Sequence, residues 1–156
     1  MFKTKRNIVL ALALCALLVP MTASAKHQVT RPFKIQGDVT VVISLLDGSF
    51  TGTETGEATH IGRYSSEGEG SFDLNTMNGT EIGVLTAANG DELFWTEAIS
   101  PGNIDRTFTG GTGRFKNAGG GFSYEITPDV VVIVIDGVPC LIIVTFRYRA
   151  TGTITY

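Results

Sequence analysis

The sequence predicts an all-β fold, a single antiparallel β-barrel of about eight strands. Apolar residues alternate with polar ones along several short segments, which indicates strands with one buried face. Turn signals that contain glycine, asparagine or aspartate recur at intervals of roughly 8–15 residues, as in sandwiches and up-and-down barrels. No segment of convincing length has the apolar period of an α-helix.

The first strand has the clearest alternation, because its apolar residues occupy odd positions from Phe33 to Leu45 while the even positions are mostly polar. Asp47-Gly48 then predicts a turn. Two further extended stretches are expected, one at about 57–65 and one at about 68–74.

The second half of the chain predicts further hairpins. Asn89-Gly90 lies between two β-prone runs, and asparagine and glycine readily adopt the left-handed conformation of a tight turn. Pro101-Gly102 predicts another turn, and Asp136-Gly137 a hairpin before a last strand near 152–156. No linker interrupts residues 26–156, which are expected to form one domain.

The N-terminus is typical of an export signal. Lys3, Lys5 and Arg6 precede an apolar run of about 11 residues, too short to span a bilayer core of roughly 30 Å. Ala23-Ser24-Ala25 matches a signal-peptidase site. We therefore expect residues 1–25 to be removed, which leaves a periplasmic or extracellular protein without a membrane span.

Charge and cysteine content exclude several classes of function. Removing the signal takes three of the twelve basic residues and none of the fifteen acidic ones, which leaves a formal charge of −6. Such a surface repels nucleic acid. Cys140 is then the one remaining cysteine, so no internal disulfide or multi-cysteine metal site is expected. We expect neither a metal nor a cofactor.

A glycine-rich segment, FTGGTGRFKNAGGGF at 108–122, fits neither a phosphate-binding loop nor a dinucleotide-binding loop, because its glycines and Lys116 have the wrong spacing. A structural corner explains it better than a ligand loop. Glycine permits a positive φ and close approach of the backbone, while Phe115 would anchor the corner in the core. The corner residues are Gly110, Gly111, Gly113 and Phe115.

This corner resembles that of the allene oxide cyclase and dirigent β-barrel superfamily, in which forms such as G-G-T-G-x-F-x-x-A-x-G occur. Residues 110–115 and 118–120 match that form, and ATHIGRY with LTAANGDELF resembles small exported bacterial proteins of the same barrel. The matching motifs cover about a quarter of the mature chain. The resemblance implies the scaffold, but no pocket residue of a cyclase or dirigent protein can be matched.

Candidate catalytic residues are His60, Arg63 and Tyr64, and His60 and Tyr64 are expected on one strand face. His60 could act as a general base in a cavity or lie satisfied on the outer surface. Candidate ligand-binding residues are Trp95 and four arginines that could meet a carboxylate at the barrel rim. The arginines are Arg63, Arg114, Arg147 and Arg149. For the pair Arg147 and Arg149, a solvated face or a charged edge strand that opposes aggregation is the favoured interpretation.

Three functions remain open at this level. The first is a non-catalytic binding or interaction module for a small apolar or amphipathic ligand, such as an amphipathic acid, with oligomers possible. The second is a cofactor-independent cyclase or isomerase that uses the barrel cavity. The third is a structural barrel with a filled interior. A cavity of roughly 300 Å³ or more with convergent polar groups would favour the first two.

The signal sequence makes a prediction about processing. Native exported protein should begin at Lys26 and carry no lipid, because Leu14 precedes Cys15 where lipoproteins have a small residue. Intact-mass measurement of material from the native host checks this. A mass that includes residues 1–25, or an acyl chain, would contradict it.

Overall fold

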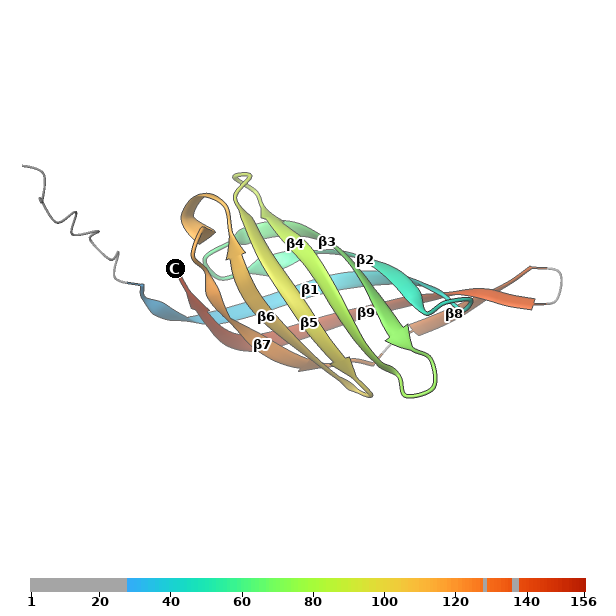
Figure 1. Cartoon of the computed structure of the whole chain (residues 1–156). Helices are drawn as coiled ribbons and strands as arrows, with labels where there is room; N and C mark the ends of the chain where they lie inside the picture. Colours follow the sequence, from blue (N-terminus) through green and yellow to red (C-terminus); the bar gives the residue numbers. More distant parts are fainter. Residues whose placement is uncertain (1–27, 128, 136–137) are drawn as a thin grey trace, which may run out of the picture.

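A computed structural model describes residues 28–127, 129–135 and 138–156, and is almost entirely β-structure (Figure 1). The predicted signal at 1–25 and the predicted turn at Asp136-Gly137 lie outside the described residues. The elements are β1 (Thr30–Ser44), β2 (Ser49–Ala58), β3 (Gly62–Asp73), β4 (Asn78–Ala87), β5 (Glu92–Ser100), β6 (Asn103–Gly111), a 3₁₀ turn η2 (Gly113–Phe115), β7 (Gly119–Glu125), β8 (Asp129–Ile135) and β9 (Val138–Thr155). In this part of the chain no helix is long and apolar enough to cross a membrane.

Eight of these strands form a closed antiparallel barrel, which confirms the predicted fold class. Each strand from β1 to β7 pairs with its neighbour in sequence, β7 pairs with β9, and β9 closes the barrel on β1. The closing register runs from Thr30 opposite Thr155 to Ser44 opposite Leu141. The ninth strand, β8, pairs with the first part of β9, and the two extend beyond one end of the barrel (Figure 1).

The turns at Asp47-Gly48, Asn89-Gly90 and Pro101-Gly102 are confirmed, but two strand predictions were wrong. The stretch predicted at 57–65 is interrupted by a turn at 59–61, where His60 has a φ of 69°. His60 and Tyr64 therefore do not share one strand. The expected last strand is the end of the continuous β9.

Gly152 stands inside β9 because β7 approaches it closely, not because the strand begins there. A Cβ at this position would lie 2.0 Å from the carbonyl oxygen of Gly121. Glycine within a strand often marks such close approach. The predicted strand boundary near residue 152 is therefore wrong.

The barrel interior is apolar at the end that carries η2. The inward positions of the strands there hold large side chains with at most 6% of their surface exposed. Phe33 and Phe108 meet edge to face with ring centroids 5.2 Å apart, in a favoured aromatic geometry. The other members of this packed end are Leu85, Leu93, Phe115, Phe122 and Ile154.

The glycine-rich corner lies at this packed end. Phe115 is fully buried, with its ring centroid 5.7 Å from that of Tyr156. Gly110 and Gly113 have φ values of 132° and 52°, which side chains rarely adopt, while a Cβ on Gly111 would lie 2.1 Å from the carbonyl oxygen of Glu92. Each of these glycines therefore occupies a position that a larger residue would strain.

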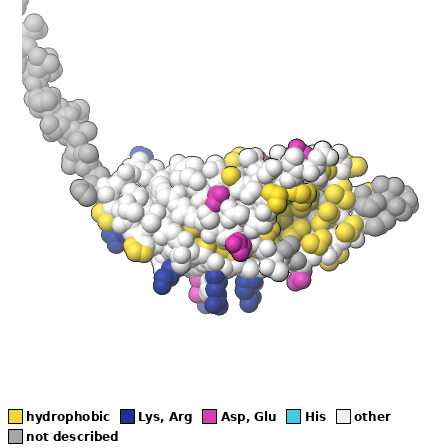
Figure 2. Space-filling view, turned by 90° about the horizontal axis from the view of Figure 1, so that it is seen from below, with side chains coloured by type: hydrophobic (Ala, Val, Ile, Leu, Met, Phe, Trp, Pro, Cys, Tyr) yellow, Lys and Arg dark blue, Asp and Glu magenta, His cyan; other side chains and the backbone are white. Residues whose placement is uncertain are grey.

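The opposite end has an apolar surface around β8. Val130, Val131 and Val132 expose 54%, 60% and 49% of their surface. Figure 2 shows hydrophobic side chains gathered at this end of the molecule, while lysines and arginines lie along the middle of the barrel and towards its other end. The two ends of the barrel thus differ in both packing and surface chemistry.

The corner geometry predicts that Gly113→Val lowers the free energy of unfolding by about 2–3 kcal/mol. A Cβ at φ 52° would lie 2.1 Å from Asp91 Oδ1, so the Asp91 side chain must move away from its partners Asn89 and Arg114, in addition to the backbone strain. Gly90→Val is the matched control, because Gly90 has a φ of 84° but open space around its Cβ, and it should cost less.

Arg114→Ala should change stability by less than about 0.5 kcal/mol. The Arg114 side chain is 42% exposed, and its ion pair with Asp91 is 3.5 Å long. Denaturant unfolding of the three variants measures the order. A larger loss for Arg114→Ala than for Gly113→Val would mean that the arginine, and not the glycine, holds the corner.

Candidate functional site

A cavity of about 370 Å³ occupies the half of the barrel opposite η2. It reaches the end of the barrel at the β3–β4 and β5–β6 turns, where Met77 and Pro101 border it. Its walls are mostly apolar. The side chains that form them include Val39, Val41, Ile43, Phe50, Phe72, Ile99, Ile104, Ile126, Ile142, Val144 and Phe146.

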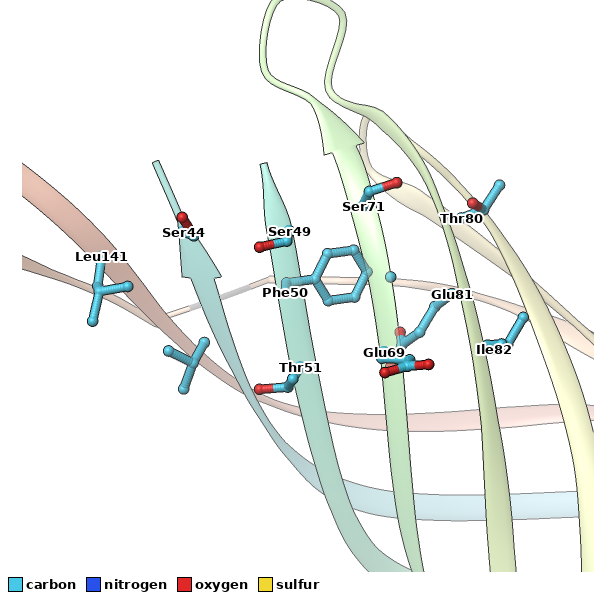
Figure 3. A pocket seen from close by; sticks show the side chains of 12 residues that line it. Ser44, Ser49, Phe50, Thr51, Glu69, Ser71, Thr80, Glu81, Ile82 and Leu141 are labelled. Atoms are coloured by element: carbon cyan, nitrogen blue, oxygen red, sulfur yellow. The ribbon is translucent and has the colours of Figure 1, made fainter. Parts of the chain in front are cut away.

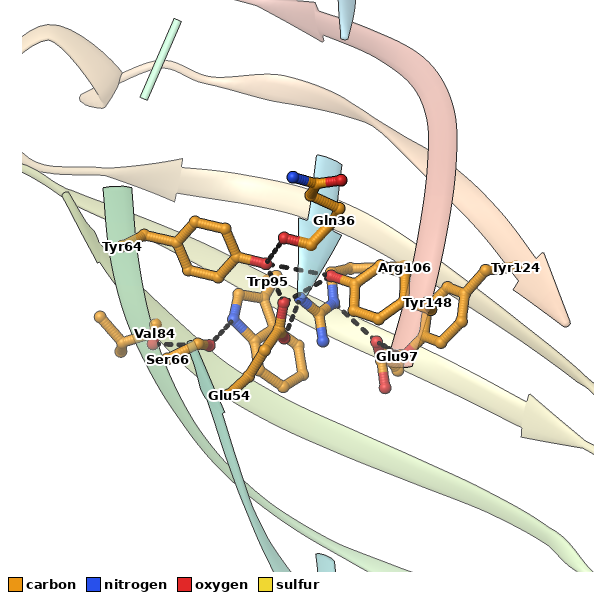
Figure 4. A network of polar contacts seen from close by, with 10 residues as sticks. All are labelled: Gln36, Glu54, Tyr64, Ser66, Val84, Trp95, Glu97, Arg106, Tyr124 and Tyr148. Atoms are coloured by element: carbon orange, nitrogen blue, oxygen red, sulfur yellow. Dashed lines mark hydrogen bonds and ion pairs between the residues drawn. The ribbon is translucent and has the colours of Figure 1, made fainter. Parts of the chain in front are cut away.

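A network of polar side chains stands at the inner end of this cavity, and Arg106 lies at its centre (Figure 4). This polar belt consists of Glu54, Tyr64, Ser66, Trp95, Glu97, Arg106, Tyr124 and Tyr148. The guanidinium Nε lies 2.6 Å from Glu97 Oε1, and Nη1 lies 2.9 Å from Glu54 Oε2. All three side chains are at most 4% exposed. The guanidinium carbon stands 4.1 Å from the centroid of the Trp95 ring, within cation–π range.

The charge of Arg106 is maintained by its partners. Burial alone lowers the pKa of a guanidinium, but the carboxylates of Glu54 and Glu97 outweigh burial and raise the pKa of Arg106 well above its ordinary value. Arg106 is therefore a fixed cation in the interior. A buried cation without such partners would be far more costly to accommodate.

Three tyrosines donate hydrogen bonds to these two carboxylates. Tyr64 and Tyr148 donate to Glu54 Oε1, and Tyr124 donates to Glu97 Oε1 over 2.9 Å. Burial first, and then the carboxylate of Glu54, raise the pKa of Tyr64 above its ordinary value. Burial is also the largest cause of the raised pKa values of Tyr124 and Tyr148. All three phenols thus stay protonated and act as donors.

Trp95 is tied to the barrel wall through a second short chain of hydrogen bonds. Its indole N–H donates to Ser66 Oγ over 3.1 Å, and the Ser66 hydroxyl donates to the carbonyl oxygen of Val84 over 3.0 Å. The indole also needs the space above Gly83, where a Cβ would lie 2.2 Å from Trp95 Cζ2. These contacts fix the ring on which Arg106 stacks.

Glu81 is a third buried carboxyl group at the cavity, and it is 8% exposed. Burial first, and then the charge of Glu97 together with a hydrogen bond to it, raise the pKa of Glu81 to about 8. Glycines make room for the side chain, because a Cβ on Gly52 or Gly68 would lie 2.8 or 2.3 Å from Glu81 Oε1. Glu81 is consequently protonated over most of the range below pH 8.

A shallower groove runs over the outside of β1 to β4 near the same end of the barrel (Figure 3). Hydroxyl side chains such as Ser49, Thr51 and Thr80 line it, together with Glu69. Glu81 borders both this groove and the interior cavity. The other buried charged residues of the interior, Glu54, Glu97 and Arg106, line the cavity but not this groove.

Of the residues predicted as site residues, Trp95 and Tyr64 lie in the polar belt. His60 lies in the β2–β3 turn, with Nε2 3.0 Å from the carbonyl oxygen of Pro32. The structure therefore does not bring His60 and Tyr64 together in a cavity.

The four predicted arginines lie on the outer surface, away from the cavity lining. Arg63 pairs with Glu57 over 3.5 Å, and its side chain is 86% exposed. Arg147 pairs with Asp38 over 2.6 Å, and Arg149 is exposed beside it on the same face of β9. Arg114 pairs with Asp91 at the corner. The arginine that reaches the cavity is Arg106, which was not among the site residues predicted from the sequence.

A signal for the missed residues is present in the sequence. Arg106 stands two residues from Ile104 and two from Phe108, and Glu97 stands two residues from Trp95 and two from Ile99. Side chains two residues apart in a strand lie on the same face, so this spacing places both charges on the inward face with those apolar residues. Glu54 occupies the corresponding position in β2. Opposite charges at inward positions of different strands indicate a buried ion pair.

Among residues 28–127, 129–135 and 138–156, no group of three or more histidine, cysteine, aspartate or glutamate side chains is arranged to hold a metal ion. The buried side-chain nitrogen and oxygen atoms described there all have hydrogen-bond partners. The polar belt is thus internally satisfied, and its chemistry is that of carboxyl, phenol, indole and guanidinium groups.

The raised pKa of Glu81 predicts a specific dependence of stability on pH. Because the folded state holds this proton more tightly than the unfolded state, the contribution is complete below about pH 4.5 and is lost as pH rises towards 8. In that window it lowers the free energy of unfolding by up to about 1.4 kcal/mol per pH unit. Glu81→Gln should remove this slope, as measured by urea unfolding at several pH values.

Glu69→Gln is the control, because Glu69 is an exposed carboxylate on neighbouring strand β3. It should leave the slope unchanged. Identical slopes in the original protein and in Glu81→Gln would show that Glu81 ionises in the ordinary range.

Comparison with known proteins gives no match: no protein-family model fits the chain, and no curated protein or solved structure is significantly similar to it.

Proposed function

We propose that this protein is an exported, non-catalytic binding protein that holds a small apolar or amphipathic molecule in the open half of its barrel. The observation that carries the proposal is the cavity of about 370 Å³, with apolar walls and convergent polar groups at its inner end. Small-molecule sites of roughly 300–1,000 Å³ commonly have this composition.

The distribution of packing supports a ligand in this half. Phe33, Leu85 and Leu93 are completely buried at the η2 end, whereas side chains that line the cavity at the other end, such as Met77 and Val130, are more than half exposed. An apolar ligand would remove their surface from water, which is worth roughly 25 cal/mol per Å² before the cost of association.

We further propose that the barrel belongs with the allene oxide cyclase and dirigent-like barrels, and that it acts in the periplasm or outside the cell. The glycine corner at 110–120 supports the first point, together with the closed eight-strand barrel. The signal-like segment at 1–25 supports the second. Neither point identifies the ligand.

A cofactor-independent cyclase or isomerase is the second candidate, and one observation favours it. Glu81 has a pKa of about 8 at the edge of the cavity, and a general acid or base works best when its pKa lies near the working pH. Binding ranks first because the other polar groups of the belt are engaged with one another. The open cavity argues against a purely structural barrel.

A cavity-filling substitution tests the binding proposal. The neutral apolar fluorophore N-phenyl-1-naphthylamine should bind the mature protein saturably, with increased emission. Val41→Trp should weaken its affinity by about tenfold or more, because Val41 points into the cavity and an indole there would occupy the ligand's space. Fluorescence titration measures both affinities.

Val42→Trp is the matched control, since Val42 follows Val41 in β1 but borders the outer groove. It should leave the affinity within about twofold. Equal loss in both variants, or no saturable binding by the original protein, would overturn the proposal.

A further inference from the structure

We propose that the cavity selects apolar ligands that carry a protonated amine over those that carry a carboxylate, with the carboxylate of Glu81 as the partner of the ammonium group. This inference rests on the proposed binding function and specifies the head group of the ligand. An amphipathic acid, the ligand named from the sequence, is an anion, whereas the ligand proposed here is a cation.

The first reason is the charge balance of the cavity. Three carboxyl groups line it, those of Glu54, Glu81 and Glu97, against the single guanidinium of Arg106 among the described lining residues. With Glu81 protonated, the set carries a formal charge of −1, and with Glu81 ionised it carries −2. A ligand carboxylate would add to this negative charge in surroundings of low dielectric constant, whereas an ammonium group would reduce it.

The second reason is that Arg106 is already occupied. Its Nε and Nη1 contact Glu97 and Glu54, and its face covers the ring of Trp95. A carboxylate ligand would have to displace one of these partners and leave a buried charge without compensation, which is costly. An ammonium group requires no such rearrangement.

The third reason is the position of Glu81. Glu54 accepts hydrogen bonds from two phenols and from Arg106, and Glu97 accepts from Tyr124 and Arg106. Glu81 lies beside this set without an ion pair to Arg106 within 4.0 Å in the described structure. It is therefore the one of the three cavity carboxyl groups that has no direct ion pair to Arg106 in the described structure, and a ligand cation would supply that partner.

Binding of a protonated amine should then release the proton of Glu81. The charged and titratable groups around this carboxyl come from several strands. Arg106 stays cationic, the phenols of Tyr64, Tyr124 and Tyr148 stay protonated, and Glu54 and Glu97 are in ion pairs with Arg106. The affinity for an amine should accordingly rise with pH towards 8, while the amine itself remains protonated.

The remainder of the mature chain favours the same sign of ligand. Without Arg106, Glu54, Glu81 and Glu97, residues 26–156 have eight basic residues against twelve acidic ones, and this negative charge attracts cations and accelerates their encounter. This effect depends on ionic strength, whereas recognition inside the cavity is screened less.

A matched series of ligands tests the proposal in the mature protein. Octylamine, octanol and octanoate displace N-phenyl-1-naphthylamine in competition at pH 8 and fixed ionic strength. We expect octylamine to bind at least about tenfold more tightly than octanoate, with octanol between them. Octanoate binding as tightly as octylamine would overturn the proposal and favour the amphipathic acid.

Glu81→Gln identifies the partner. It should reduce octylamine affinity by about tenfold, abolish its rise between pH 6 and 8, and leave octanol affinity unchanged. Glu69→Gln, on the outer surface, should alter none of these. Unchanged octylamine affinity in Glu81→Gln would overturn the role of Glu81, and if that variant does not fold, a flat pH profile for octylamine in the original protein would do the same.

The outcomes separate this inference from the binding function. If the fluorophore and octanol bind in a manner that Val41→Trp blocks but the amine has no advantage, the cavity is a binding site and the inference about its head group is wrong. If none of the three ligands displaces the fluorophore, or the fluorophore does not bind, both are wrong.

Discussion

The buried ion pairs of Arg106 are the constraint on which the rest of the interior depends. A guanidinium removed from water is tolerable only with close, hydrogen-bonded counter-charges, so Glu54 and Glu97 must reach it from two other positions around the barrel. Their remaining lone pairs then require donors, which Tyr64, Tyr124 and Tyr148 supply. Inward glycines on neighbouring strands leave the space that these long side chains need. One charge thus determines the residue types on most strands of the barrel.

This arrangement divides the barrel into parts with separate roles. The phenylalanine and leucine side chains at the η2 end supply the continuous apolar packing that stabilises the fold. The polar belt closes that core and presents carboxyl groups to the open half. Because the belt satisfies its own hydrogen bonds, the barrel can keep a partly empty end without leaving polar atoms unpaired there. The space for a ligand is therefore compatible with a stable scaffold.

The barrel could be predicted from sequence because alternation and turn chemistry are local. The run from Phe33 to Leu45 and the turn at Asn89-Gly90 each lie within a few residues. The site could not be predicted in the same way, because the partners of Arg106 are as far as 52 positions away and meet only when the barrel closes. Surface arginines such as Arg147 stand in equally regular strands, and position in a strand alone does not separate a buried charge from a solvated one. A buried charge can be distinguished from a solvated one when residues of opposite charge occupy inward-facing positions of different strands.

The long closing strand β9 also has a consequence for how the chain reaches this structure. It pairs with β1 from Leu141 to Thr155, and the contact between Thr30 and Thr155 joins residues 125 positions apart. Contacts of such high sequence separation slow folding, because chain entropy is lost before the pairing repays it. The other barrel strands pair mainly with their neighbours in sequence and can form hairpins early, but the barrel remains an open, curved sheet until its last strand is available. A chain truncated before β9 would expose two unpaired strand edges and the whole polar belt to water. The interior is therefore shielded from water only when β9 closes the barrel.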